Sequence, residues 1–263
     1  MLAQPRGAMA AQDLLPSIQR IVARDALVIA VIEGSRPPMI RRGKDGTYSG
    51  FDVDLGKEIA RALGVKPQFV PAGPRDEDVI EAVASGRADI GLSYFSESVE
   101  AGKRLFFSRP YLIEAHTVFI NRVKGAEFDD DCLSISGLKR LGKKSGGLGM
   151  LDRSRYARLA KRAGPGAEIQ LFPDMESLGA AVQAGKIVAS VQGELSAKYY
   201  LSRHPKGSFR MRYCIVHNVR NRVAALVRPD AIDLLRWLDI YIVQRGVIID
   251  LDTLLYRADR AVY

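Results

Sequence analysis

The chain has 263 residues, a formal net charge of +9 and two cysteines, with 47% hydrophobic and 26% charged residues. This composition is typical of a globular protein and excludes a disordered chain, a collagen and a small disulfide-based scaffold. The length suffices for one large core or for two domains of about 100–150 residues. No apolar run reaches the roughly 18 residues that a membrane-spanning helix needs.

The positive charge raises the question of a nucleic-acid or anionic partner. Lysine and arginine are spread along the whole chain, and no C-x-x-C or RNA-binding aromatic motif occurs. We therefore interpret the charge as a surface property and expect no nucleic-acid partner. Cys132 and Cys214 lack metal-ligand spacing and form either one bridge in an oxidising compartment or two free thiols. With three histidines in the chain, we predict no metal site.

The first twelve residues, MLAQPRGAMAAQ, do not form a complete signal sequence. The Ala8-Met9-Ala10 segment resembles the small-residue end of a secretory signal, but no charged or apolar region precedes it. A remnant of a signal, a tag and the start of a cytosolic protein are the three interpretations that stay open.

The first half of the chain is predicted to begin with a helix that Asp13 caps, followed by a strand buried on both faces. A hairpin turn at Asp45-Gly46 precedes an amphipathic helix that Gly64 ends, and a second strand comes next. The residues of these two helices and two strands are, in chain order, 13–23, 26–32, 52–63 and 67–71. The order strand, helix, strand indicates a parallel βαβ unit.

Two segments about 99 residues apart, 80–90 and 179–189, share the pattern A-V-x-x-G-[RK]. Each is predicted to be a helix, a glycine stop and a strand. A period this long excludes a solenoid and suggests two lobes of similar build. Chance similarity between two helix–strand turns is the alternative.

The remaining elements are predicted from short apolar runs and from one long periodic segment. Strands are expected at 117–120, 146–151, 169–172 and 223–227, and helices at 155–163 and 231–243. The polar segment 124–131 is expected to connect the lobes. The glycine-rich segment 144–149 lacks the Gly-Lys-Ser/Thr ending of a phosphate loop, so we interpret it as a loop or the start of a strand.

No motif of a serine hydrolase, zinc peptidase, P-loop or dinucleotide site stands in a usable context. Two strand-to-helix junctions, 93–98 and 152–154, are candidates instead, because ligands of open α/β sheets bind outside the carboxyl ends of strands. Ser96, Ser98 and Ser154 can hold an anion at a helix N-terminus, and simple N-capping is the alternative. Glu33, Arg36 and Glu194 are expected on loops beside strand ends.

Several motifs together resemble the family-3 bacterial extracellular solute-binding proteins. An apolar strand at 27–32 is followed by Pro37-Pro38-Met39 and by G-F-D-V-D-L at 50–55. The sequences G-R-A-D-I at 86–90 and F-S-R-P-Y at 107–111 then follow in the order and spacing of the family. The resemblance extends from about residue 13 to residue 241.

The resemblance implies an α/β fold of the type II periplasmic binding class. Each of its two lobes has a mixed, mainly parallel sheet flanked by helices, and two hinge strands let the lobes close on a small ligand. Lobe 1 would comprise residues 13–118 and 219–263, lobe 2 residues 119–218, and residues 1–12 a tail. The chain would then be a periplasmic monomer without cofactor or catalytic activity. It would capture a small polar or anionic solute, amino-acid-like or an organic acid, for an ABC permease in the inner membrane.

The resemblance also implies a ligand-binding set. It consists of Glu33, Arg36, Met39, Phe51, Tyr94, Phe95, Ser96, Ser98, Arg153, Ser154 and Glu194. Two departures are informative, because amino-acid binders of the family carry Arg where this chain has Ala101 and Asp where it has Gly193. A carboxylate that loses its bidentate arginine in a buried site loses much of its affinity. A standard α-amino acid is therefore disfavoured, and Arg36 and Arg153 are expected to receive an anionic group.

Two alternative functions remain from the sequence. Some relatives resemble cyclohexadienyl dehydratases, and such an enzyme needs a carboxyl general acid, for which Glu33 and Glu194 are the candidates. The other alternative is a sensor or interaction module whose pocket has drifted from ligand binding.

Overall fold

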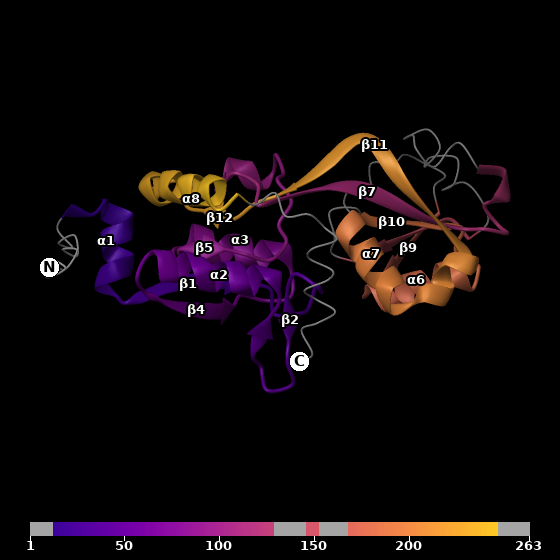
Figure 1. Cartoon of the computed structure of the whole chain (residues 1–263), viewed down its shortest axis with the longest axis horizontal. Helices are drawn as coiled ribbons and strands as arrows, with labels where there is room; N and C mark the ends of the chain where they lie inside the picture. Colours follow the sequence, from indigo (N-terminus) through magenta and orange to yellow (C-terminus); the bar gives the residue numbers. More distant parts are fainter. Residues whose placement is uncertain (1–12, 129–145, 153–167, 247–263) are drawn as a thin grey trace, which may run out of the picture. The chain divides into compact units, whose positions relative to one another are not determined.

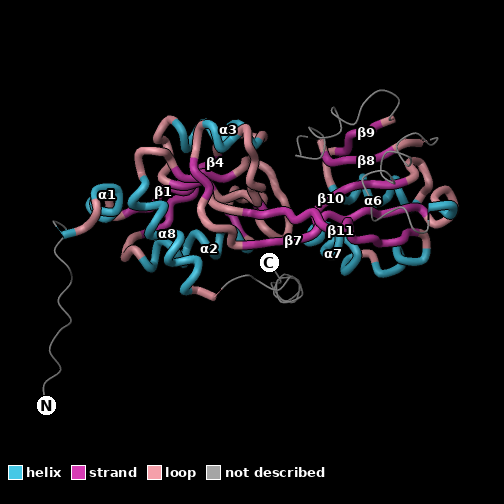
Figure 2. Tube along the Cα trace, turned by 90° about the horizontal axis from the view of Figure 1, so that it is seen from above, coloured by secondary structure: helices cyan, strands magenta, loops and turns pink. Residues whose placement is uncertain are grey.

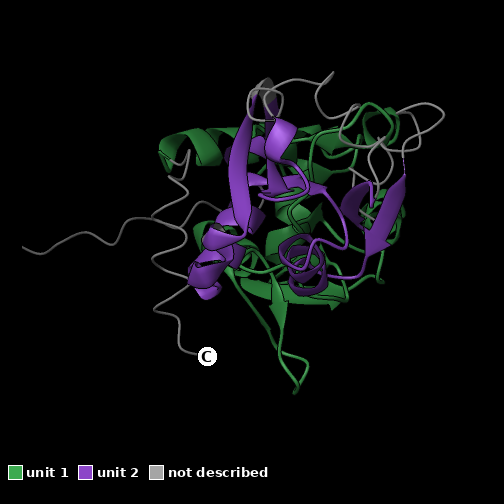
Figure 3. Cartoon of the chain, turned by 90° about the vertical axis from the view of Figure 1, so that its right-hand side faces the viewer, with its two compact units in different colours: residues 1–111, 223–248 green, residues 112–222, 249–263 purple. Residues whose placement is uncertain are grey.

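The computed structural model describes residues 13–128, 146–152 and 168–246. The chain forms two compact units, which Figure 3 shows in different colours. Of the described residues, unit 1 contains 13–111 and 223–246, and unit 2 contains 112–128, 146–152 and 168–222. Residues 124–128 lie inside unit 2, whereas the sequence analysis placed a connection between lobes there.

Unit 1 is built on a five-stranded sheet with the order β4-β1-β5-β12-β6. Its strands are β1 (Ala26–Val31), β4 (Lys66–Pro71), β5 (Ile90–Gly91), β6 (Phe106–Phe107) and β12 (Leu226–Val227). Strand β1 lies between β4 and β5 and is parallel to both, and β12 is antiparallel to β5 and β6. Leu27, Ile29 and Val31 are fully buried, as the continuous apolar run predicts for a strand covered on both faces.

The α-helices of unit 1 lie close to their predicted positions, whereas the short η2 was not predicted. The helices are α1 (Pro16–Ala23), α2 (Phe51–Ala62), α3 (Asp76–Ala84), the short η2 (Ala101–Lys103) and α8 (Ile232–Gln244). Gly64 has φ +73° and ends α2, as predicted. The predicted cap at Asp13 is wrong, because α1 begins at Pro16 with Leu15 as its N-cap. Proline suits the first helical position, where its missing N–H would have no helical partner.

The first and the last described helix of unit 1 pack against each other. The helix α8, yellow in Figure 1, packs against α1, in indigo. The Ser17 amide donates a hydrogen bond of 2.6 Å to the Asp233 carboxylate. The predicted hairpin at Asp45-Gly46 is also confirmed, since β2 (Arg41–Arg42) pairs antiparallel with β3 (Tyr48–Ser49) around it.

Unit 2 is built on a second five-stranded sheet with the order β11-β7-β10-β8-β9. The strands are β7 (Leu112–Asn121), β8 (Leu148–Leu151), β9 (Ile169–Phe172), β10 (Ala189–Gly193) and β11 (Met211–Val223). Strand β8 is parallel to β9 and to β10, while β10 is antiparallel to β7. The long strands β7 and β11 run beside each other in Figure 2.

One face of the unit 2 sheet is covered by α6 (Met175–Gln183) and α7 (Glu194–Arg203). Phe119 packs there with Leu178 and Val182 of α6 and Tyr200 of α7. Two short helical turns, η3 (Ala126–Phe128) and η5 (Pro205–Phe209), complete the described elements of this unit. Helix α7, which follows β10 without an intervening loop, was not predicted, and neither was most of β11, whose apolar residues are interrupted by polar ones.

The two similar segments of the sequence are structurally equivalent. They are α3 with β5 and α6 with β10, and in each a glycine with positive φ follows the helix, Gly86 at +77° and Gly185 at +67°. Strand β5 joins β1 on the side away from β4, and β10 joins β8 on the side away from β9. The prediction of two lobes of similar build is confirmed at this level.

Candidate functional site

The strand order of unit 1 reverses next to β1. The chain passes from β1 through α2 to β4 on one side, and then through α3 to β5 on the other side. Ligands of open α/β sheets bind outside the carboxyl ends of the strands at such a reversal. In unit 1 these ends lead into residues 32–36 and 92–94, which we call the unit 1 edge.

Arg36 is fixed at the unit 1 edge by two contacts. Its Nη2 lies 2.6 Å from Oδ1 of Asp76, the first residue of α3, and its Nη1 donates to the Ser93 carbonyl at 3.1 Å. The Arg36 side chain is 26% exposed. These two contacts use two of the five N–H donors of a guanidinium, which is always charged. The edge therefore presents a positioned cation, at a residue that the sequence analysis selected.

Ser93 joins the ends of the two strands at this edge. Its hydroxyl accepts a hydrogen bond of 2.8 Å from the Ile32 amide, beyond β1, and donates one of 2.6 Å to the Leu92 carbonyl, beyond β5. Ser93 is completely buried. The backbone that carries Arg36 on one side and Tyr94 on the other is thus held in one geometry.

Asp52 is the buried anchor of the edge. It lies in the first turn of α2 and is fully buried; its Oδ2 accepts a 2.6 Å hydrogen bond from the Tyr94 amide and its Oδ1 accepts one from the Tyr111 hydroxyl. Burial raises the pKa of Asp52 to about 7, against the lowering effect of these hydrogen bonds and of nearby Arg36. Tyr94 adopts φ +58°, which a side chain rarely does without such support. Asp52 was predicted only as part of the G-F-D-V-D-L motif, and the signal that could have singled it out is an acidic residue in a first helical turn.

Several other predicted ligand residues of unit 1 are part of its core. Met39 is fully buried, and Phe51 and Phe95 are 8% and 4% exposed. The Phe51 ring packs against that of Tyr111, with ring centroids 6.1 Å apart. Glu33 is exposed, and its Oε1 lies 3.3 Å from Nη1 of Arg42. Among the predicted ligand residues of unit 1, Arg36 and Tyr94 thus both lie at the unit 1 edge. Met39, Phe51 and Phe95 are buried, and Glu33 lies on the surface.

The predicted serines after β5 both contact the backbone of unit 1. Ser98 Oγ accepts a hydrogen bond of 3.2 Å from the amide of Ala101, the first residue of η2, although the N-cap residue of η2 is Glu100. Ser96 forms a bridge to Val223 through its backbone.

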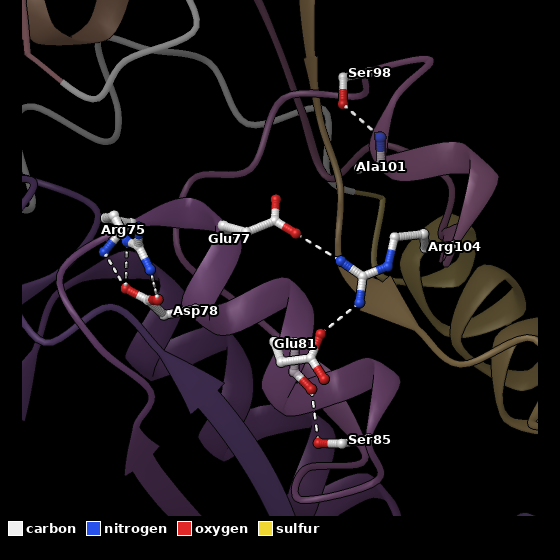
Figure 4. Close-up of polar contacts among 8 residues, drawn as sticks. All are labelled: Arg75, Glu77, Asp78, Glu81, Ser85, Ser98, Ala101 and Arg104. Atoms are coloured by element: carbon white, nitrogen blue, oxygen red, sulfur yellow. Dashed lines mark hydrogen bonds and ion pairs between the residues drawn. The ribbon is translucent and has the colours of Figure 1, made fainter.

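Ala101, at the position where amino-acid binders of the resembled family carry arginine, is buried and 7% exposed. The next arginine, Arg104, does not replace that group at the edge. Figure 4 shows its guanidinium lying between Glu77 and Glu81 of α3, with a 2.6 Å contact to Glu77. This ion pair instead ties the segment after η2 to α3.

The equivalent edge of unit 2 lies at the carboxyl ends of β8 and β10. Glu194 occupies it as the first residue of α7, not on the predicted loop. Its Oε2 accepts a 3.2 Å hydrogen bond from the Ala115 amide, and its Oε1 lies 3.3 Å from Lys198 Nζ. The two other residues predicted for this edge, Arg153 and Ser154, lie outside the described residues.

A second buried carboxyl group, that of Glu114, supports this region of unit 2. Its Oε2 accepts a hydrogen bond of 2.9 Å from the Leu195 amide, and its Oε1 accepts one of 2.7 Å from Asn221 Nδ2. Glu114 and Asn221 are both 2% exposed. The start of α7 and the end of β11 are therefore held by one side chain, which the sequence analysis did not select.

Three further observations concern metal binding, membrane spanning and the cysteines in the part of the chain that the structure describes. Among residues 13–128, 146–152 and 168–246, no group of three or more His, Cys, Asp or Glu side chains is arranged to hold a metal ion. No helix within those ranges has the length and apolarity needed to cross a membrane. Cys214 of β11 is disulfide-bonded. Cys132 lies outside the described residues.

Comparison with known proteins identifies relatives of this architecture. The family model for bacterial extracellular solute-binding proteins, family 3, matches residues 27–244. The L-cystine-binding protein TcyJ of Escherichia coli (strain K12) is 26% identical over 181 residues, which are 68% of this chain and 63% of that protein. The match thus spans less than two thirds of that relative. The cyclohexadienyl dehydratase of Pseudomonas aeruginosa is 25% identical over 201 residues, covering 76% of this chain and 69% of the enzyme.

Solved structures share the fold at lower identity. An ancestral cationic amino acid solute-binding protein aligns with a TM-score of 0.71 at 24% identity, covering 92% of this chain and 98% of that one. A binding component of an ABC transporter from Wolinella succinogenes, solved with lysine, aligns with a TM-score of 0.71 at 22% identity, covering 89% and 95%. These likenesses confirm the predicted α/β fold class.

Proposed function

The chain belongs to the bacterial extracellular solute-binding proteins, family 3, and from this premise we propose that it captures a small polar or anionic solute in the periplasm and delivers it to an ABC permease in the inner membrane. The family and its curated relatives consist mainly of binding proteins rather than enzymes. The disulfide at Cys214 supports an oxidising compartment such as the periplasm.

The observation that carries the solute class is the placement of Arg36. Its guanidinium lies at the strand reversal of unit 1, where Asp76 and the Ser93 carbonyl fix its orientation. A pre-positioned guanidinium is the preferred bidentate partner of carboxylate and phosphate groups. Because Ala101 supplies no charge, we assign the recognition of an anionic group on the solute to Arg36.

A dehydratase is the second candidate, since the match to the Pseudomonas aeruginosa enzyme has the same level of identity. The arrangement of the two candidate acids supports binding instead. Glu33 is exposed and paired with Arg42, and Glu194 is engaged by Lys198 and the Ala115 amide. A general acid has to lie within hydrogen-bond reach of the substrate atom that it protonates. Because both carboxylates are already paired with basic side chains of the protein, we favour binding over dehydration.

A thermal-shift screen tests the proposal. The purified chain is tested against amino acids, organic acids, polyamines and aromatic acids. A true solute raises the melting temperature, because a concentration of 100 times Kd adds about 2.7 kcal/mol to the free energy of unfolding. We expect a hit with an anionic group that is recovered unchanged after incubation. Consumption of the hit would identify an enzyme, a polyamine hit would contradict the anionic class, and the absence of any hit would favour a drifted interaction module.

The role of Arg36 is tested with the hit from that screen. Arg36→Met should weaken binding about 10-fold or more, as expected when a charged hydrogen bond is lost. Arg42→Met is the matched control, because Arg42 is a nearby arginine on the same unit that pairs with exposed Glu33. Equal affinities of the two variants would exclude Arg36 as the anion-binding group.

A further inference from the structure

Two large apolar side chains protrude from one end of unit 2. Val123 is 86% exposed and Phe209 is 79% exposed. The Arg122 amide donates a 2.9 Å hydrogen bond to the Arg210 carbonyl. Val123 directly follows Arg122 in the sequence, and Phe209 directly precedes Arg210. Val123 and Phe209 are therefore neighbours on two adjacent turns, one after β7 and one before β11.

Basic residues are frequent in the turns that carry this pair and in the turn after α6, and Asp129-Asp130-Asp131 follow outside the described residues. Three turns, with the strand residues that border them, comprise residues 121–128, 184–187 and 205–212; they follow β7, follow α6 and precede β11. They contain six basic residues and one acidic residue: Arg122, Lys124, Lys186, Lys206, Arg210, Arg212 and Glu127.

Two contacts hold these turns together. Arg212 Nη2 donates to the Gly125 carbonyl at 2.8 Å, and the aliphatic part of the Lys124 side chain lies beside Gly185. We call the surface formed by these three turns, including Val123 and Phe209, the distal patch.

We propose that the distal patch binds the surface of an anionic lipid bilayer, with Phe209 and Val123 entering the interface. Exposed apolar side chains surrounded by lysine and arginine are typical of proteins that lie on such surfaces. A bilayer interface buries two protruding side chains without shape complementarity. A stable protein partner would instead require a matching surface of roughly 1,000 Å² or more.

The distal patch is at the opposite end of the unit 2 sheet from its candidate solute edge. Strand β10 runs antiparallel to β7, so Ala189 pairs with Ile120 near the patch and Gly193 pairs with His116 far from it. Glu194 follows Gly193 at the carboxyl end of β10. Membrane contact through the patch therefore leaves the solute edge of unit 2 uncovered.

Vesicle co-sedimentation tests this proposal without any solute, so its outcome is independent of the proposed transport function. The full chain is mixed with phosphatidylcholine vesicles and with vesicles that also contain phosphatidylglycerol, at low salt and at about 0.15 M salt. We expect binding only to the anionic vesicles, weakened by salt. Val123→Ser with Phe209→Ser should reduce partitioning about 10-fold, and Lys124→Ala with Arg210→Ala should reduce it about 25-fold.

Two control variants lie in unit 1 and should bind vesicles like the unchanged chain. Val99→Ser removes a valine that is 81% exposed, and Lys44→Ala removes an exposed lysine from the β2–β3 turn. Circular dichroism confirms that each variant is folded. The proposal is overturned by absence of binding to anionic vesicles, by equal losses in the controls, or by binding that needs the basic residues but not Phe209 and Val123. The last result would point to an acidic protein or another polyanion.

Discussion

The hydroxyl of Tyr111 donates a hydrogen bond of 2.9 Å to Oδ1 of Asp52, across 59 positions of sequence. Tyr111 is the last residue before the chain enters unit 2, and Asp52 lies in the first turn of α2. The second oxygen of Asp52 binds the Tyr94 amide at the unit 1 edge. One buried carboxyl group thus connects a helix start, the candidate solute edge and the exit of the chain from unit 1.

Replacement of Tyr111 by phenylalanine removes a donor from a fully buried carboxyl group. Tyr111→Phe should lower the free energy of unfolding by about 1–3 kcal/mol, the cost of leaving a buried polar atom without its partner. Urea denaturation followed by circular dichroism measures this. Tyr48→Phe is the matched control, because the Tyr48 hydroxyl is buried without a hydrogen-bond partner among the described residues. Equal stability of the two variants would contradict the anchoring role of Tyr111.

The raised pKa of Asp52 predicts a pH-dependent stability. In the unfolded chain this carboxyl group titrates near 3.9, whereas burial raises its pKa in the folded state to about 7. Between these values the folded state retains a proton that the unfolded state has released, so stability falls as the pH rises. Between pH 5 and pH 8 the titration of Asp52 should lower the free energy of unfolding by about 2–3 kcal/mol. Urea denaturation across this range measures the effect.

Asp52→Asn should remove most of that slope, because an amide does not titrate. Asp54→Asn is the control on the same helix, since the Asp54 side chain is 54% exposed and should leave the slope unchanged. The pKa values of Asp45 and Asp174 are lowered by hydrogen bonds from Thr47 and Ser177, so their titration lies below the range measured. If Asp52→Asn and the unchanged chain had the same slope, Asp52 would not be the titrating group.

Gly50 is required where the chain enters α2. It has φ +113°, and a Cβ at this position would lie 2.6 Å from the Met39 carbonyl oxygen and 2.8 Å from that of Pro38. Because both obstacles are backbone atoms, Gly50→Ala should destabilise unit 1 by about 1–3 kcal/mol. Gly34→Ala is the control, since nothing lies within 4 Å of its added methyl group. Differential scanning calorimetry compares the two, and equal melting temperatures would contradict the steric argument.

Glu114 should be intolerant of an isosteric change. Glutamine has one carbonyl oxygen and an NH₂ group, so Glu114→Gln sets a donor against either the Leu195 amide or the Asn221 amide. We expect a loss of about 1–3 kcal/mol in urea denaturation. Hydrogen exchange should also become faster in the first turn of α7. Glu168→Gln, at an exposed carboxylate, is the control, and equal exchange in both variants would argue against this role of Glu114.

The sequence alone determined much of the local structure of this protein. Strand β1 is predictable because a strand covered on both faces needs a continuous apolar run. The helix–glycine–strand segments around Gly86 and Gly185 are predictable because a glycine with positive φ ends each helix. The position of Arg36 is predictable because it follows the apolar run of β1 within a few residues. The resemblance to the family is likewise carried by short motifs that stand in a fixed order along the chain.

Tertiary structure alone decided which of these residues act together. The roles of Asp52 and Glu114 depend on partners 42–107 positions away, such as Tyr94 and Asn221, and no local pattern encodes such a pairing. For the same reason no local pattern shows that Met39 and Phe95 are buried or that Ser98 contacts the Ala101 amide, and the ligand roles expected for these residues stay predictions. Local sequence fixes backbone preference and the apolar face of each element, whereas the environment of a side chain depends on contacts that only the folded chain makes.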